Sequence, residues 1–457
     1  MSETGIARRS SLHGQWSSRL AFVLAVTGSA VGLGNIWRFP YIAGENGGGA
    51  FVLVYLVCIV IVGLPIMMSE VLIGRRGRRN PVSTMTLLGK EESGTGSWGL
   101  VGALGLGSGF LILSFYSVIA GWAVAYVIES ASNTFEGATA ASVEQVFNSL
   151  ASNPLRTGLW HTIFLAATAF VIARGVERGI ERAVRVMMPA LVVLLLVLLG
   201  YSAVEGNFAQ GVRFLFEPRF EELTRDGMME ALGHAFFTLS VGMGAVMAYG
   251  AYLPSGTSIM KMSVAVVAAD TAIALVAALI VFPIVFANGL APDAGPGLVF
   301  QSLPLAFSQM PGGAIIATTL FVLLTFAAWT SAISLMEPAT AWCIEKLGLT
   351  RALAATAVAG ITWILGLLTV LSFSTLSGVT FLRGTFFDNI DFLSNSILLP
   401  FGGLAIVIFA GWIMARASTA SELDPDAGTA YRVWRFTARY LTPLAVVAVL
   451  LRGVGLI

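Results

Sequence analysis

Charged residues are scarce in this chain: Asp, Glu, Lys and Arg make up only 11% of its 457 residues. Soluble domains carry about 25% charged residues, so a soluble fold would lack the polar surface needed to cover its apolar groups. Hydrophobic residues reach 56%, and the mean hydropathy is +0.84. The formal net charge of +1 gives no electrostatic basis for a nucleic-acid partner. The composition therefore predicts an integral membrane protein whose main partner is the lipid bilayer.

Cysteine and histidine are also rare. The two cysteines, Cys58 and Cys343, lie in apolar stretches and have no spacing that suits a metal site or a disulfide framework. The three histidines, His13, His161 and His234, are widely separated, which leaves acid–base chemistry without partners. We therefore expect no catalytic residues, and a protein that is not an enzyme.

Apolar stretches of the length needed to cross a bilayer, about 20 residues, occur eleven times. Their approximate centres are Leu33, Leu56, Tyr116, Leu165, Leu194, Leu239, Leu275, Ala327, Ile364, Ile406 and Val446. Arginines lie before the first stretch and after the second, fourth, eighth (Arg351 alone) and tenth. Because positive loops stay in the cytoplasm, this alternation predicts a multi-pass protein of the inner (plasma) membrane. Its N-terminus would be cytoplasmic, and the polar segment 419–429 would be a cytoplasmic loop.

Glycine pairs interrupt two of these stretches. Gly32 and Gly34 lie in the middle of the first stretch, and Gly242 and Gly244 lie in the middle of the sixth. Each glycine weakens a helix by about 1 kcal/mol relative to alanine, and paired interruptions point to a transporter site. Close helix packing is the alternative explanation for such glycines. A break would free carbonyls for a hard cation such as Na⁺ and amides for a carboxylate.

The spacing of the two breaks, five stretches apart, predicts an inverted repeat. An odd number of spans makes the second copy enter the membrane from the opposite side. We therefore divide the chain into an N-terminal segment (1–15), a first five-helix repeat (16–205), a second repeat (206–416), and a final loop with the eleventh helix (417–457).

Two long motifs resemble the signature of the neurotransmitter:sodium symporter family. They are Gly-Ser-Ala-Val-Gly-Leu-Gly-Asn-Ile-Trp-Arg-Phe-Pro at 28–40 and Glu-Asn-Gly-Gly-Gly-Ala-Phe at 45–51. The similarity extends through all eleven stretches. It implies an all-α membrane protein of the LeuT type, with broken first and sixth helices. It also implies a symporter that couples amino-acid import to sodium.

The resemblance implies two Na⁺ sites, a substrate site and two gates. The first Na⁺ site would comprise Ala30, Asn35, Thr238 and Asp270, and the second Gly28, Val31, Ala327, Thr330 and Ser331. The substrate site would comprise Ala30, Leu33, Gly34, Ile112, Tyr116, Phe237, Thr238, Ser240, Met243, Ser331 and Leu335. The extracellular gate would comprise Arg38, Phe237 and Asp391, and the cytoplasmic gate Trp16, Tyr252 and Glu345.

Several residues depart from the family pattern. Asp270 replaces an asparagine found in chloride-binding members, so we expect chloride-independent transport; a protonated, hydrogen-bonded Asp270 is the alternative. Gly32 lacks the aspartate typical of monoamine carriers, which favours an amino acid, and flexible Met243 favours a bulky hydrophobic one. His13 stands where the family usually has arginine, while Arg8 and Arg9 lie slightly earlier, so which of these residues closes against Glu345 stays open. His234 replaces a glutamine; either a proton role or a neutral, packed histidine is consistent with it.

The sequence therefore predicts sodium-coupled import of hydrophobic or aromatic L-amino acids by alternating access. Two alternatives on the same scaffold stay open: a passive channel, which would need continuous pore-lining rings, and an amino-acid sensor that does not transport.

Overall fold

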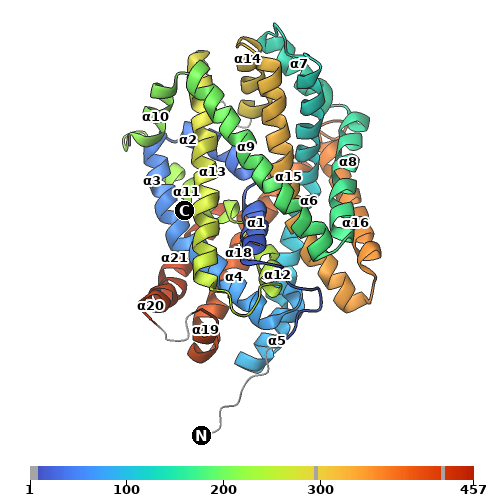
Figure 1. The fold of residues 1–457 in the computed structure, drawn as a ribbon, viewed down its shortest axis with the longest axis vertical. Helices are drawn as coiled ribbons and strands as arrows, with labels where there is room; N and C mark the ends of the chain where they lie inside the picture. The colour runs from blue at the N-terminus through green and yellow to red at the C-terminus, as the bar shows by residue number, and fades with distance from the viewer. Residues whose placement is uncertain (1–8, 293–296, 424–427, 457) are drawn as a thin grey trace.

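The computed structural model describes residues 9–292, 297–423 and 428–456, and nearly all of its regular structure is helical. Figure 1 shows the long helices running roughly parallel, between an end that holds α5 and α19 and an opposite end that holds α7 and α14. We call these ends the α5 face and the α7 face. Within the described ranges, nine continuous helical segments are long and apolar enough to span a membrane. The predicted all-α membrane architecture is confirmed.

The nine continuous segments are built from α-helices, and four of them also include π-helical turns (η). They are α3 (Gly49–Cys58) with η2 (Ile59–Gly63) and α4 (Leu64–Gly77); α6 (Gly99–Ala131); α8 (Pro154–Ala173); η3 (Val176–Glu181) with α9 (Arg182–Glu205); α13 (Ile259–Ala287); α15 (Gly313–Leu347); α16 (Arg351–Ser372); α17 (Phe386–Asp391) with η5 (Phe392–Leu398), α18 (Leu399–Ile408) and η6 (Phe409–Ile413); and α20 (Thr429–Phe436) with η7 (Thr437–Leu441) and α21 (Thr442–Gly453).

The remaining helices are shorter. They are α1 (Arg19–Ala30), η1 (Gly34–Arg38), α2 (Phe39–Glu45), α5 (Pro81–Ser93), α7 (Ala140–Ala151), α10 (Phe208–Phe216), α11 (Arg225–Thr238), α12 (Ala245–Ala251), η4 (Leu298–Ser302), α14 (Leu303–Ser308) and α19 (Arg416–Leu423).

The first and sixth predicted spans are both broken. α1 and the segment Gly34–Glu45 form one span bent by 52°. The sixth span consists of α11 and α12, separated by residues 239–244. Neither α11 nor α12 is long enough by itself to qualify as a span. By length and composition, the described helices therefore give ten candidate spans when the bent pair is counted as one, and not the eleven predicted. The glycine pairs thus mark real interruptions of the helices.

Glycine also brings the second half of the broken sixth span close to α4. A Cβ on Gly74 would lie 2.0 Å from the Met247 carbonyl oxygen, and a Cβ on Gly250 would lie 2.8 Å from the Val71 carbonyl oxygen. Such distances leave no room for a side chain. α12 can therefore reach the centre of the molecule, where α1 packs against α9, α12, α13 and α15.

One local expectation is wrong. The segment 419–429, predicted to be a loop, includes the second half of α19. Polar contacts hold this helix: Arg75 Nε donates to Glu422 Oε2 at 2.6 Å, and the hydroxyls of Thr419 and Tyr431 lie 2.7 Å apart. Its polar side chains have partners on other helices, which local composition does not reveal. Residues 424–427 lie outside the described part of the chain.

Candidate ion and substrate site

The break in the first span frees backbone groups at the centre of the molecule. α1 ends at Ala30 and η1 begins at Gly34. Between them, the Gly32 N–H donates to Asn35 Oδ1 at 3.1 Å, and the Leu33 N–H donates to the Tyr116 hydroxyl at 3.3 Å. Side chains thus satisfy amides that an unbroken helix would have satisfied itself. These are groups with which a carboxylate can interact.

The break in the sixth span lies against the first. Ser240, Gly242 and Gly244 have φ angles of +53°, +87° and +78°, a left-handed conformation that costs glycine little. The Ser240 hydroxyl donates to the Ser29 carbonyl at 2.8 Å, which joins the two breaks directly.

A buried carboxylate supports the second break. Glu70, fully buried on α4, accepts hydrogen bonds from the N–H groups of Gly242 and, at 3.1 Å, of Met247. We did not predict this residue. A glutamate within an apolar span is itself a signal that could have revealed it, because membrane-embedded charges are costly and usually functional.

The residues predicted for the first Na⁺ site come together around Asp270. Asn35 Nδ2 donates to Asp270 Oδ1 at 2.8 Å, and the Thr238 hydroxyl donates to Asp270 Oδ2 at 3.1 Å. All three side chains are buried. Ala30, the fourth predicted ligand, is buried at the end of α1 and lines the same small cavity as Thr238. Each of these residues has an oxygen that could serve as a ligand, and Asp270 adds one acidic group, which suits a hard alkali cation.

The residues predicted for the second Na⁺ site lie where α1 meets α15. Ser331 Oγ lies 3.4 Å from the Gly28 carbonyl oxygen and 3.2 Å from that of Val31. Thr330 Oγ1 lies 3.0 Å from the Ala327 carbonyl oxygen. The five oxygens of the predicted site therefore lie in one region, where the end of α1 meets α15.

A small cavity of about 30 Å³ lies between the two breaks. Its lining includes ten of the eleven predicted substrate residues together with Ser29 and Gly32: it comprises Ser29, Ala30, Gly32, Gly34, Ile112, Tyr116, Phe237, Thr238, Ser240, Met243, Ser331 and Leu335. The eleventh, Leu33, lines a neighbouring cavity. The lining combines hydroxyl side chains (Tyr116, Ser240 and Ser331) with apolar ones (Ile112, Met243 and Leu335).

The neighbouring cavity is larger, about 540 Å³, and shares Gly34, Tyr116 and Phe237 with the small one. Arg38 and Asp391, predicted as an extracellular gate, both line it. The Arg38 guanidinium lies 5.0 Å from the centre of the Phe237 ring, whereas Asp391 accepts a hydrogen bond from Asn395 at 2.6 Å. Among the described residues no ion pair joins Arg38 to Asp391, so the two charges flank an open space. Phe237 lies between this space and the small pocket.

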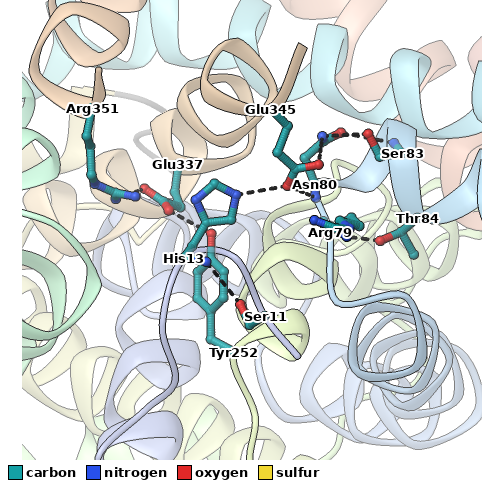
Figure 2. Close-up of polar contacts among 10 residues, drawn as sticks. All are labelled: Ser11, His13, Arg79, Asn80, Ser83, Thr84, Tyr252, Glu337, Glu345 and Arg351. Atoms are coloured by element: carbon teal, nitrogen blue, oxygen red, sulfur yellow. Dashed lines mark hydrogen bonds and ion pairs between the residues drawn. The ribbon is translucent and has the colours of Figure 1, made fainter. Parts of the chain in front are cut away.

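On the α5 face, the N-terminal segment closes the structure. Trp16 is 2% exposed; its backbone N–H donates to the Tyr252 carbonyl and its ring N–H to the Tyr249 carbonyl, both at 3.0 Å. His13 Nε2 lies 2.8 Å from Glu345 Oε1 (Figure 2). The residue that meets Glu345 at the position of the usual arginine is therefore His13.

Tyr252 is predicted for the same gate as Glu345, and its hydroxyl contacts a different carboxylate. The hydroxyl donates instead to Glu337 Oε1 at 2.8 Å, and Glu337 Oε2 pairs with Arg351 at 2.5 Å (Figure 2). Glu337 was not predicted, although its position in the apolar stretch of α15 is again the signal of a functional charge. Arg351, counted above as a loop charge, is drawn inward by this partner.

His234 lies in a packed environment. The ring is 1% exposed and lies 5.6 Å from the Phe39 ring and 5.5 Å from the Tyr55 ring, measured between centroids. Neither ring nitrogen has a hydrogen-bond partner among the described residues. This geometry matches the packed alternative; the proton role is untested.

Two broken spans that meet at a buried oxygen-rich pocket, with a cavity on one side and a closed face on the other, define a membrane transporter of the LeuT type. Residues 13–154 and 148–455 match the model of the Sodium:neurotransmitter symporter family. The chain belongs to this family, and it is a sodium-dependent transporter, not an enzyme.

Similar proteins support this assignment along the whole chain. An uncharacterized sodium-dependent transporter of Bacillus subtilis, YhdH, is 36% identical over 447 residues, which cover 97% of this chain and 98% of the relative. A similar transporter of Haemophilus influenzae is 31% identical over 441 residues, 95% of this chain and 96% of the relative. The crystal structure of MhsT in complex with L-phenylalanine matches with a TM-score of 0.89 and 40% identity, over 96% of this chain and 99% of that one.

Proposed function

We propose that this transporter imports hydrophobic or aromatic L-amino acids together with Na⁺ by alternating access, without a requirement for chloride. The observation that best supports an amino-acid substrate is the limited space around Gly32. A Cβ at this position would lie 2.6 Å from Ser331 Oγ and 2.9 Å from the Tyr116 hydroxyl. A side chain here would have to displace both hydroxyls, and Gly32 itself supplies no carboxylate, so the substrate must supply its own. MhsT, whose structure contains L-phenylalanine, supports the apolar side chain.

The pocket has suitable groups for both ends of such a substrate. We propose that the carboxylate meets the amides of Leu33 and Gly34 and the hydroxyl of Tyr116. The ammonium would meet the carbonyls of Ala30 and Phe237. Ile112, Met243 and Leu335 supply apolar contacts for the side chain. A pocket of about 30 Å³ must widen to admit phenylalanine, and flexible Met243 can move with little cost.

We propose two Na⁺ ions, one at each oxygen cluster. The clusters fit this cation because each offers several oxygens and no soft ligand. The carboxylate of Asp270 supplies the negative charge that a chloride ion would otherwise provide, which is the basis for chloride independence. Coupling follows from position: both clusters include groups at the first break, so ions and substrate stabilise the same arrangement of the backbone.

The cavities support alternating access rather than a channel. The 540 Å³ cavity reaches the pocket from one side, while Trp16, His13 and Glu345 close the other. We propose that the α5 face, with its arginine-rich segments, is cytoplasmic and that the large cavity is extracellular. The cycle would open the α5 face after Phe237 and the Arg38–Asp391 pair close above the substrate.

Uptake into proteoliposomes tests the proposal. The purified protein should accumulate L-[³H]phenylalanine when Na⁺ is higher outside, in chloride-free buffer. A channel would give uptake without accumulation, and a sensor would bind L-phenylalanine without uptake. Either result would replace the proposed function.

A further inference from the structure

Glu345 is a buried carboxylate with an unusual set of partners. Its side chain is 5% exposed, and it accepts hydrogen bonds from the Asn80 backbone N–H at 2.7 Å and the Asn80 side-chain amide at 2.6 Å. His13 Nε2 is the third neighbour, at 2.8 Å. Across residues 9–292, 297–423 and 428–456, no Lys or Arg nitrogen lies within 4.0 Å of this carboxylate. His13 is therefore its cationic partner in that part of the chain, and only when protonated.

Figure 2 shows the imidazole between Glu345 and Tyr252, with its ring centre 5.9 Å from that of Tyr252. The other nearby acid on α15, Glu337, is already neutralised by Arg351.

Three further charged groups lie on the elements around this segment. Arg79 directly precedes Asn80 at the start of α5. Glu177 of η3 lies near the residue that follows His13, with Oε1 3.9 Å from the Cβ position of Gly14. Arg9, earlier in the same segment, is paired with Glu91. The unbalanced group in contact with the imidazole is thus the Glu345 carboxylate.

We propose that His13 makes closure of the α5 face dependent on pH. A neutral imidazole makes an ordinary hydrogen bond to Glu345, whereas an imidazolium makes a charge-assisted one, which is roughly twice as strong. Histidine is the side chain that changes charge between about pH 5 and 8. The closed face, in which the two groups touch, binds the proton more tightly than an open face in which they separate. Acidification on this side therefore stabilises the closed state, and alkalinisation favours opening.

A permanently charged arginine at this position would close the face with the same strength at every pH in this range. Histidine instead links inward opening to the proton concentration of the compartment that receives the substrate. This inference rests on the proposed gate role of the α5 face, and it deepens that role.

Distances between spin labels test the proposal directly. Labels at Gln15→Cys and Lys90→Cys, both exposed positions, in a Cys58→Ala/Cys343→Ala background, report whether the N-terminal segment lies against α5. The protein is measured in nanodiscs without Na⁺ or amino acid. Between about pH 5.5 and about pH 8.5 the ratio of closed to open populations should fall about fivefold in the otherwise native chain.

His13→Arg and His13→Gln are the matched variants. Both ratios should be independent of pH, high for His13→Arg and low for His13→Gln. A ratio that does not change with pH in the native chain would overturn the proposal. So would a His13→Arg variant that keeps the native pH response, because the response would then come from His161, His234 or an acid. The measurement needs no substrate, so a failure of amino-acid uptake and a failure of this proposal are distinguishable.

Discussion

Gly32 is the residue on which the predicted substrate class depends most. Because a Cβ would crowd Ser331 and Tyr116 at 2.6 and 2.9 Å, we expect Gly32→Ala to weaken L-phenylalanine binding by at least about tenfold, ~1.4 kcal/mol. Scintillation-proximity binding at saturating Na⁺ measures this. Gly107→Ala is the matched control, since nothing lies within 4 Å of its added methyl group. Equal affinity in both variants would show that the substrate does not lie against Gly32.

Asp270 is the residue on which chloride independence depends. Asp270→Asn removes the carboxylate that Asn35 and Thr238 contact. We expect the Na⁺ concentration for half-maximal binding to rise about tenfold or more, since a unit charge close to the cation is lost. Added chloride should restore part of the affinity. Asp226→Asn, at a side chain 85% exposed, is the control. Native Na⁺ affinity in the Asp270→Asn variant, measured without chloride, would contradict this role.

The sequence was informative about single residues where a motif or a glycine pair marked them. Nearly every predicted substrate residue lines one pocket because both breaks lie near the middle of their spans. Glu70 and Glu337 were missed because their partners are remote: Glu70 is 172 residues from Gly242. The signal that each of them carries is a charge within an apolar stretch.

At the scale of elements, the broken sixth span needs support from α4. Glu70 holds two amides that the break exposes, and an unsatisfied buried amide costs about 1–3 kcal/mol. We therefore expect Glu70→Ala to lower thermal stability in detergent strongly, and Glu70→Gln, which keeps one acceptor oxygen, to lower it less. Glu205→Ala, at an exposed position, should have little effect. Equal melting temperatures for all three variants would mean that the carboxylate does not stabilise the break.

Element boundaries were predictable where hydrophobic periodicity and glycine determine them. They were not predictable where polar tertiary contacts do. α19 forms in a segment that looks like a loop, because Glu422 and Thr419 find partners on α4 and α20. The proximity of α4 and α12 at Gly74 likewise depends on packing between segments far apart in the chain.

At the scale of the molecule, the structure combines a closed α5 face with a cavity on the other side of the pocket. Phe237 lies between the large cavity and the small pocket. The N-terminal segment closes the α5 face through Trp16 and His13. Coupled transport requires that at least one face be closed at any time, because two open faces would dissipate the Na⁺ gradient.

Sodium-driven accumulation is the measurement that tests the central claim most directly. Proteoliposomes with an inward Na⁺ gradient in chloride-free buffer should concentrate L-phenylalanine above the external level. Replacing external Na⁺ with K⁺ should abolish this accumulation, and Asp270→Asn should reduce it. Accumulation of L-phenylalanine that is equal in Na⁺ and K⁺, or no accumulation of any hydrophobic amino acid under a sodium gradient, would contradict the account.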